Sequence, residues 1–368
     1  MRSSYREEDV TLLLKDITGL VEPQSTRERE KLIQSGRHYC EMLPIEYVPS
    51  EAYMEAYREA LARYAGVMAE ALAALGERIL AQRGSEVTLV SLARAGIPIG
   101  ILLKHCLERR CGGNIPHYAI SIIRGKCIDQ NAMGYILDRH RAETVLFVDG
   151  WIGKGAILGE LARCIQAYPG VSPQLAVVSD PAGMTELYGT REDILIPSSC
   201  LNSTVSGLLS RTFLRDDIIG PTDFHGAVYY GELAEADLSY AFIHAIEREF
   251  PGQGDLSAPE NSGRMRQLRN SQEKEALFPQ GDTGLEEVKE IAASFSIDDI
   301  NLVKPGIGET TRVLLRRLPW KILIGTQWQS DQALAHIRRL AWEKGVEIIP
   351  YPLRHYKACG LIQKMTDV

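Results

Sequence analysis

The sequence predicts an α/β protein: a mainly parallel sheet flanked by helices, followed by a small α/β/α domain at the C-terminus. Three observations support this. Short apolar strands alternate with helices between residues 87 and 179, the pattern of crossover units in a parallel sheet. A stretch rich in Gly, Pro, Ser and charged residues then precedes a second alternating region. The 368 residues, 45% of them hydrophobic, exceed what one ordinary core accommodates.

The elements are expected in the following order. Ser50 is a candidate N-cap for a long helix whose apolar residues recur at helical spacing as far as Ile79. The main sheet then comprises the strands VTLVSL, HYAISII, TVLFVD and QLAVVS, with helices near 98–110 and 154–167. In the C-terminal region we expect helices near 285–294, up to 318 and near 331–344, strands at KILIG and VEIIPY, and a short closing helix.

These elements divide the chain into an N-terminal extension (1–48), a main domain (49–250), a linker (251–283) and a C-terminal domain (284–368). The first residues lack a secretory pattern and no segment has the apolar length that a membrane span requires, so we expect a cytoplasmic protein without membrane contact. Seven scattered cysteines without a Cys-x-x-Cys pair predict reduced thiols rather than a zinc site or a disulfide framework.

Charge is distributed unevenly along the chain. The net charge is -7, yet residues 284–368 hold 12 Lys and Arg against 10 Asp and Glu. A mildly basic C-terminal domain permits contact with RNA.

The segment 145–156 runs from an apolar strand through small residues into a helix. Gly153 and Gly155 allow backbone amides to close around a phosphate at the positive end of that helix, and Lys154 adds charge. Asp149, at the strand end, is placed to accept hydrogen bonds from sugar hydroxyls. Because ligands of parallel sheets bind where strands end, residues 93–96 and 180–183 are candidates for the same site. A strand-Asp-glycine-helix turn also occurs in many doubly wound folds without this role.

With its strand and its Asp149, this segment resembles the phosphoribosyl-diphosphate motif of type I phosphoribosyltransferases, although Gly150 stands where that family has a second acid. The upstream segment SLARAGIPIG is similar to the diphosphate loop of the same family, with Arg94 as its charge. The resemblance places a closing loop at 124–129. It implies catalytic roles for Asp149, Arg94, Arg124 and Lys126, although a basic loop is also commonly just exposed.

The resemblance further implies that the chain binds phosphoribosyl diphosphate or a related ribosyl phosphate. Mg2+ would be held by the substrate, without direct protein ligands, and a base-like acceptor, whose identity stays open, would react at the anomeric carbon. The hood over the substrate would come from residues 37–46 and those around His225. Asn202 or Ser203 could instead cap a helix. The substrate-binding residues expected are Ala93, Ala95, Gly96, Gly150, Trp151, Ile152, Gly153, Lys154, Gly155, Asp180, Ser198, Ser199, Asn202 and Ser203.

In the C-terminal domain, KPGIGETTR opens a helix with glycines, which suits close approach of a backbone phosphate. The order of elements resembles the Pelota and kink-turn-binding ribosomal protein family, with Gly308 where that family has Asn. The resemblance implies contact with structured RNA; the alternative is an α/β interaction module that binds no RNA. The expected RNA-binding residues are Gly306, Gly308, Glu309, Thr311, Arg312, Arg316 and Arg354.

The combination of SGRHYCEMLP, the main domain, LNSTVSGLLSRT and the Pelota-like region resembles the phosphoribosyltransferase family of tellurite-resistance gene clusters, also labelled StiP cysteine proteases. Three functions follow as hypotheses: a pentosyltransferase with an RNA-binding domain, a non-catalytic regulator that senses ribosyl phosphate and binds RNA, and a cysteine protease. For the protease, Cys200 with His225 or Cys40 beside His38 are candidate pairs. A homodimer is compatible with each.

Overall fold

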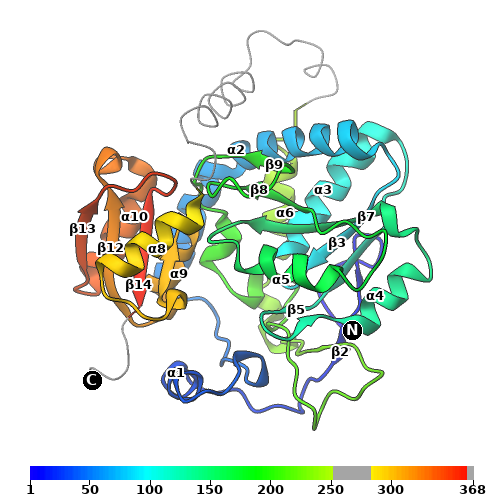
Figure 1. Cartoon of the computed structure of the whole chain (residues 1–368), viewed down its shortest axis with the longest axis horizontal. Coiled ribbons are helices and arrows are strands. Elements are labelled where there is room, and N and C mark those ends of the chain that lie inside the picture. Colours follow the sequence, from blue (N-terminus) through cyan, green and yellow to red (C-terminus); the bar gives the residue numbers. More distant parts are fainter. Residues whose placement is uncertain (252–282, 363–368) are drawn as a thin grey trace.

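The computed structural model describes residues 1–251 and 283–362, so nearly all of the predicted linker (251–283) lies outside the described residues. The main domain is built on a six-stranded sheet of order β1-β4-β3-β7-β8-β9, in which every neighbouring pair is parallel (Figure 1). The predicted mainly parallel sheet is confirmed.

The four longer strands lie where the apolar runs predicted them, and a strand from the N-terminal extension completes one edge. The six strands are β1 (Thr11–Leu12), β3 (Thr88–Leu92), β4 (His117–Ile120), β7 (Val145–Trp151), β8 (Leu175–Ser179) and β9 (Tyr188–Thr190). Two small sheets pair β2 (Lys15–Asp16) with β10 (Gly226–Ala227) and β5 (Ile122–Ile123) with β6 (Cys127–Ile128).

Helices cover both faces of the main sheet. On one face lie α2 (Glu51–Arg83), α3 (Gly96–Cys111) and α6 (Ser239–Glu247); on the other lie α4 (Gln130–Leu137) and α5 (Ala156–Ile165). Helix α1 (Thr26–Gln34) stands apart in the N-terminal extension (Figure 1). Ser50 does occupy the N-cap position of α2, but its side chain makes no capping hydrogen bond.

The strand β7 shows how the sequence pattern builds this layering. Successive side chains of a strand point to opposite faces. Accordingly, Leu146 and Val148 enter the core beneath α2 and α3, while Val145 and Phe147 enter the core beneath α4 and α5. All four are fully buried, which explains the unbroken apolar run of this central strand.

The C-terminal domain contains a four-stranded mixed sheet of order β11-β14-β12-β13. Its strands are β11 (Val303–Pro305), β12 (Pro319–Gly325), β13 (Glu347–Tyr351) and β14 (Ala358–Ile362), and its helices are α8 (Gly284–Ser294), α9 (Ile307–Arg316) and α10 (Ala335–Glu343). The predicted short closing helix is wrong: residues 358–362 form β14, which lies between β11 and β12. Periodicity alone does not distinguish so short an apolar run from a buried helix turn.

Short 3₁₀ helices make up the remaining regular structure that is described. They span Tyr39–Glu41, Ala142–Thr144, Pro197–Cys200, Ser203–Val205, Gly231–Ala236, Ile300–Leu302, Thr326–Trp328 and Gln332–Leu334. Within the described ranges, no helix combines the length and the apolar character needed to cross a membrane.

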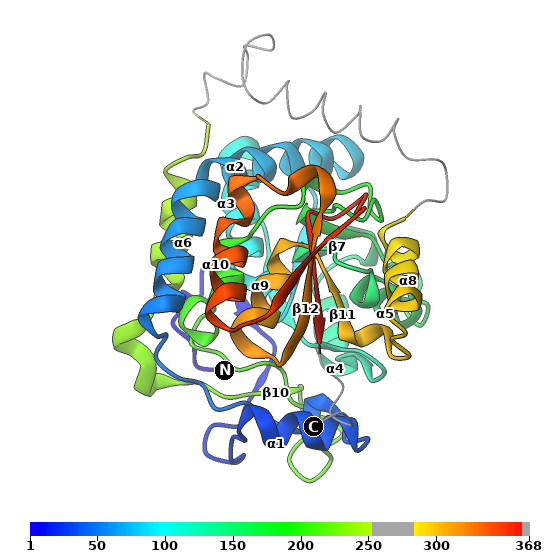
Figure 2. The same cartoon turned by 90° about the vertical axis from the view of Figure 1, so that its left-hand side faces the viewer.

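The two domains share their hydrophobic cores. The core beneath α2 contains Ile307 and Leu314 of the C-terminal domain, and the core beneath α5 contains Val288 and Tyr356. Figure 2 looks onto the C-terminal domain, with the main domain behind it. At the periphery, Arg339 of α10 pairs with Glu59 of α2 at 2.9 Å. Burial of apolar side chains therefore holds the domains together, with polar contacts at the rim.

The prediction that all cysteines are reduced thiols is wrong for one pair. Cys127 and Cys164 form a disulfide across 37 residues of sequence, because the β5–β6 hairpin lies against α5. The spacing of the cysteines along the chain does not indicate that Cys127 and Cys164 lie close together. Five cysteines remain free: Cys40, Cys106, Cys111, Cys200 and Cys359.

Candidate functional site

A cavity of about 220 Å³ lies where β7 ends and the C-terminal domain meets the main domain. Most of the residues that line it come from the predicted phosphate turn, the predicted closing loop and the predicted RNA-binding loop, and the others come from the predicted diphosphate loop, α5 and β8. The lining residues are Ala95, Arg124, Asp149, Trp151, Ile152, Gly153, Lys154, Gly155, Ala156, Ile157, Leu158, Leu175, Lys304, Pro305, Glu309 and Arg312. Two binding sites that the sequence suggested separately therefore form one cavity.

The phosphate turn forms the main-domain wall of this cavity. Gly155 has a φ of +77° at the N-cap position of α5, a left-handed conformation that favours glycine. A Cβ atom there would also lie 2.5 Å from Cε of Met184. The turn brings residues 153–155 to the N-terminus of α5, where the helix dipole and free amides favour an anion.

Asp149 faces the cavity from the end of β7. Its Oδ1 atom accepts a hydrogen bond of 2.7 Å from the Gly150 amide. Burial raises the pKa of Asp149 to about 7, and the nearby Glu309 also raises it, while the Gly150 amide and Arg312 act in the opposite direction. At neutral pH this carboxyl group is therefore able both to accept and to donate a proton.

Lys154 is tied to the C-terminal domain. Its Nζ atom donates to the carbonyl oxygen of Val303 at 3.2 Å and to that of Ile300. Burial lowers its pKa to about 7, and repulsion by Lys304 and Arg124 acts in the same direction. A bound anion would favour the charged ammonium.

The C-terminal domain supplies three charged side chains to the cavity, Lys304, Glu309 and Arg312. Arg312 donates to Oε1 of Glu309 at 2.8 Å, and its guanidinium carbon lies 5.9 Å from the centre of the Trp151 ring. Burial acts to raise the pKa of Glu309, but Arg312 and Lys304 outweigh it, so that pKa lies below its usual value. Glu309 is therefore an ionised acceptor.

The N-terminus of α9 is directed at the main domain. Both carboxylate oxygens of the buried Asp193 accept from the Ile307 amide, at 2.9 and 3.1 Å, and Oδ2 also accepts from the Lys357 amide at 2.9 Å. Gly306, with a φ of +91°, makes this approach possible, since a Cβ atom there would lie 3.2 Å from Oδ1 of Asp193. A carboxylate of the same chain thus occupies the helix end that the sequence assigned to an RNA phosphate.

The predicted catalytic side chains separate into two groups. Arg124 lines the cavity, and its Nη1 atom donates to Oδ1 of Asn301 at 2.6 Å. Arg94 instead donates to the Leu209 carbonyl at 2.6 Å and pairs with Glu46 at 3.2 Å, and Lys126 is exposed on the loop. Neither Arg94 nor Lys126 lines the cavity.

Several predicted substrate-binding residues do not line the cavity. Gly96 is buried, and it packs so closely on β7 that a Cβ atom there would lie 2.6 Å from the Val148 carbonyl oxygen. Asp180 is buried, accepts from the Met184 amide at 2.7 Å and pairs with Arg191. Those that do not line the cavity are Ala93, Gly96, Gly150, Asp180, Ser198, Ser199, Asn202 and Ser203.

The remaining predicted RNA-binding residues are mostly enclosed. Thr311 is buried, donating to the Ile307 carbonyl and contacting Nε2 of His336 at 2.8 Å. A Cβ atom on Gly308 would lie 3.8 Å from the Trp151 ring. Burial lowers the pKa of Arg316 to about 10, whereas Arg354 is exposed and pairs with Glu290 at 2.8 Å.

Sequence reasoning did not identify two residues where the domains meet: Lys304, which lines the cavity, and Asp193, which accepts from the α9 N-terminus. Lys304 directly precedes the Pro-Gly turn, and its proximity to that turn was the signal available. Asp193 lies in a loop without a distinctive pattern, so nothing local predicted its role.

One of the two candidate protease pairs is in contact. Nδ1 of His38 lies 2.9 Å from Sγ of Cys40, and Nε2 of His38 lies 2.9 Å from the Arg124 carbonyl oxygen. Cys40 is fully buried, and burial raises its thiol pKa to about 11. Burial raises the pKa of the Cys200 thiol to about 12. His225 makes its hydrogen bonds elsewhere, from its ring Nδ1 atom to Ser121 and from its backbone amide to Asp129. Both thiols are therefore protonated at neutral pH.

Two family models match the chain. Residues 3–247 match the family described as tellurite-like stress resistance cysteine protease StiP, and residues 282–364 match the Pelota RNA-binding domain. A protein of Acinetobacter baylyi named cysteine protease StiP is 33% identical over 375 residues, covering 98% of this chain and 94% of that protein. Two structures of a Bacillus anthracis hypoxanthine-guanine phosphoribosyltransferase align at 15% identity with a TM-score of 0.23, covering 40% of this chain and 80% and 81% of theirs.

The raised pKa of Asp149 predicts a pH-dependent effect of the substitution Asp149→Asn. The carboxyl group titrates near 4 in the unfolded chain and at about 7 in the folded chain. The wild-type fold therefore loses stability as the pH rises from about 4 to about 7. The variant lacks this loss, so its free energy of unfolding relative to wild type should rise over that range, by up to roughly 4 kcal/mol.

Urea unfolding at pH 5 and pH 8 measures this difference. The control is Asp217→Asn, which removes an exposed carboxylate paired with Arg215. The hydrogen bond from Arg215 lowers the pKa of Asp217, so this carboxyl group is ionised in both the folded and the unfolded chain at pH 5 and at pH 8, and the effect of the substitution should be the same at both pH values. An Asp149→Asn difference that is the same at both pH values would show that Asp149 is already ionised at pH 5.

Proposed function

We propose that this chain, which belongs to the StiP family, binds a ribosyl phosphate in the cavity between its two domains and transfers a base-like group at the anomeric carbon of the sugar. The observation that carries the proposal is the composition of the cavity. The amides of a glycine turn at a helix N-terminus, a carboxyl group at a strand end and four cationic side chains all face one space of about 220 Å³.

The charges of the cavity fit a dianionic or more highly charged ligand. Arg124, Lys154, Lys304 and Arg312 stand against Asp149 and Glu309. Burial and repulsion by neighbouring cations lower the pKa values of Lys154 and Lys304, so the positive charge of these two side chains is incompletely stabilised by the protein. An anionic ligand would relieve that repulsion, which favours its binding.

In the proposed reaction the 5-phosphate lies against the 153–155 turn and Asp149 accepts hydrogen bonds from the ribose hydroxyls. Arg124, Lys304 and Arg312 neutralise the charge that develops on a leaving diphosphate. Asp149, with its pKa of about 7, and the ionised Glu309 are placed to hold or accept the proton of an attacking nitrogen nucleophile. The C-terminal domain excludes water from the sugar centre.

Mg2+ fits this site as a partner of the substrate. Two carboxylates face the cavity, fewer than a dedicated all-protein site uses, and Mg2+ commonly binds through one or two carboxylates and substrate phosphates. Asp149 and Glu309 would hold its water ligands, and the ion would supply further positive charge to the diphosphate.

Thermal unfolding with phosphoribosyl diphosphate and Mg2+ tests the ligand directly. A ligand at 100 times its Kd stabilises the fold by about 2.7 kcal/mol, so Tm should rise. Lys154→Met or Arg312→Gln should weaken binding about tenfold or more, because each removes a charge-assisted contact.

The matched control is Arg248→Gln, at an exposed position after α6, which should keep the wild-type response. Ribose 5-phosphate and diphosphate, tested separately, identify which half of the ligand is recognised. If none of the three compounds raises Tm, the ribosyl phosphate proposal is rejected. Binding without release of diphosphate would favour the non-catalytic regulator.

RNA binding is the second component of the proposal. The match to the Pelota RNA-binding domain supports it. Because Glu309 and Arg312 of the RNA-binding loop line the same cavity as the phosphate turn, RNA held by this loop and ribosyl phosphate should compete.

Fluorescence anisotropy of a labelled hairpin RNA measures this competition. At fixed Mg2+ and salt concentrations, saturating phosphoribosyl diphosphate should raise the apparent Kd for RNA about tenfold, and Arg312→Gln should weaken RNA binding. Unchanged RNA affinity in the presence of bound ligand would place the RNA on another surface.

Proteolysis is a second candidate function, favoured by the name of the Acinetobacter baylyi relative and by the contact between His38 and Cys40. In a thiol protease the thiolate attacks the peptide carbonyl carbon and a histidine takes the thiol proton. The Cys40 side chain would have to become exposed first, because it is fully buried.

Hydrolysis of fluorescently labelled casein tests this candidate. If proteolysis belongs to the His38–Cys40 pair, Cys40→Ser should abolish it and Cys200→Ser should leave it unchanged. Equal activity of wild type and Cys40→Ser would exclude the pair as the nucleophile and base.

A further inference from the structure

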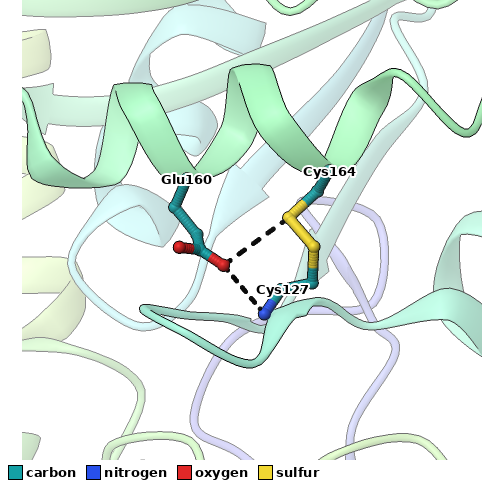
Figure 3. Close-up of side chains that lie close together, drawn as sticks. All are labelled: Cys127, Glu160 and Cys164. Atoms are coloured by element: carbon teal, nitrogen blue, oxygen red, sulfur yellow. Dashed lines mark hydrogen bonds between the residues drawn. A yellow bond between two sulfur atoms is a disulfide. The ribbon is translucent and has the colours of Figure 1, made fainter.

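Three side chains outside the cavity gather between the predicted closing loop and α5. Cys127 lies on β6, directly after the loop residues 124–126, and Cys164 lies in the last turn of α5. Their sulfur atoms are bonded, and Glu160, one helical turn before Cys164, faces the pair (Figure 3). Neither the proposed transferase nor the protease candidate uses this cluster.

We propose that Cys127 and Cys164 are a thiol–disulfide exchange site that determines how firmly the loop carrying Arg124 is held beside the cavity. The exchange itself is independent of the ligand that the cavity binds. Its effect on binding rests on the proposed function.

The position of the disulfide joins two parts of the cavity wall. Arg124 lines the cavity from the loop, three residues before Cys127. Helix α5 begins at the phosphate turn, which lines the cavity from another side. The disulfide closes a covalent connection between the loop and this helix, so its cleavage enlarges the set of loop conformations.

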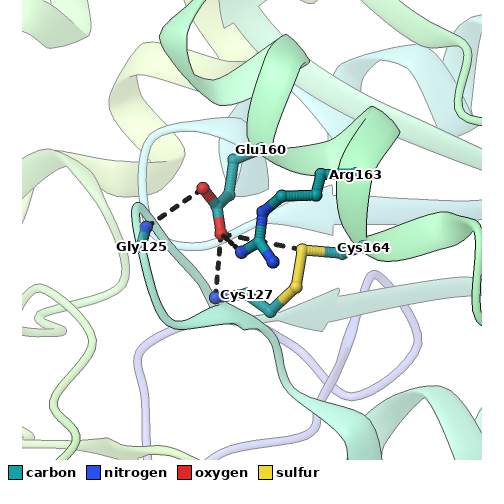
Figure 4. The surroundings of a disulfide bond; sticks show 5 residues. All are labelled: Gly125, Cys127, Glu160, Arg163 and Cys164. Atoms are coloured by element: carbon teal, nitrogen blue, oxygen red, sulfur yellow. Dashed lines mark hydrogen bonds and ion pairs between the residues drawn. A yellow bond between two sulfur atoms is a disulfide. The ribbon is translucent and has the colours of Figure 1, made fainter.

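Glu160 of α5 holds the loop against the helix. Its Oε2 atom accepts from the Gly125 amide and its Oε1 atom from the Cys127 amide, both at 3.0 Å, and it pairs with Arg163 (Figure 4). These hydrogen bonds do not depend on the disulfide. They keep Cys127 near Cys164 after reduction, which makes reoxidation an intramolecular step.

Reduction proceeds by two exchange steps with a dithiol. One thiolate of the reductant attacks Sγ of Cys127, the half-buried member of the pair, and expels the buried Cys164 as a thiolate that then takes a proton. The second thiolate of the reductant attacks the mixed disulfide and releases Cys127. The reductant leaves as a disulfide, and the protein gains two electrons and two protons.

The same three residues have the side-chain types of a metal site. In this structure the sulfur atoms are bonded to each other, and the Glu160 oxygens are engaged by two amides and Arg163. A cation would have to displace Arg163, so the geometry favours disulfide exchange.

The test uses the full-length chain, equilibrated with mixtures of reduced and oxidised dithiothreitol. Thiols are then blocked with a maleimide of known mass and counted by mass spectrometry. We expect one pair of thiols to appear together, and this pair to be lost in Cys127→Ser and in Cys164→Ala. Cys111→Ser, which removes an exposed free cysteine, should leave the pair intact.

Trypsin reports on the loop, because Arg124 and the exposed Lys126 are cleavage sites within it. Cleavage after these residues should be about fivefold faster or more in the reduced chain than in the oxidised chain. Trypsin should cleave the Cys127→Ser and Cys164→Ala variants as fast as the reduced wild-type chain under both reducing and oxidising conditions. Either variant is sufficient if the other fails to fold.

Binding of phosphoribosyl diphosphate with Mg2+ is then compared between the two states. We expect the affinity to differ by about threefold or more, a difference absent in Cys127→Ser. Equal tryptic rates in both states, or a pair of thiols that never oxidises, would overturn the exchange site. Unequal tryptic rates with equal affinities would overturn its effect on the cavity. If neither state binds the ligand, the proposed function fails, while the thiol count and trypsin still decide the exchange site.

Discussion

The arrangement of the cavity depends on one polar contact inside the largely apolar domain interface, the hydrogen bonds from the α9 N-terminus to the carboxylate of Asp193. Amides at a helix N-terminus are a ready anion site, and here a side chain of the main domain fills it. The Lys357 amide donates to the same carboxylate. These bonds fix the position of α9, so Glu309 and Arg312 face the phosphate turn.

This docking accounts for the electrostatics of the cavity. Asp149, Arg124 and Lys154 of the main domain and Lys304 and Arg312 of the C-terminal domain line the same cavity. Enclosure removes water, raises the pKa of Asp149 to about 7 and lowers that of Lys154 to about 7. Asp149 and Lys154 are thus among the groups whose pKa burial shifts strongly, and both would contact the proposed ligand, as is typical of functional sites.

Much of the fold was predictable from the sequence, because the unbroken apolar run of β7 and the glycines at 153 and 155 determine local structure directly. The phosphate turn and the RNA-binding loop were each predictable as a separate site, but the cavity that they form together was not. Asp149 and Arg312 were each assigned to a site, but their proximity arises from packing between segments more than 150 residues apart. For the same reason, no pattern in the sequence indicated the Cys127–Cys164 bond. Arg94 was expected at a ligand, but Glu46 and the Leu209 carbonyl hold it. The short run of β14 was misassigned because its pairing partners lie elsewhere in the chain.

A crystal structure of the full chain grown with ribose 5-phosphate tests the central claim most directly. The account predicts electron density for a phosphate against the amides of residues 153–155, with the sugar beside Asp149 and with Arg312 of the C-terminal domain at the same ligand. Density for the phosphate elsewhere, or bound by the main domain with the C-terminal domain displaced from the cavity, would contradict a site built by both domains.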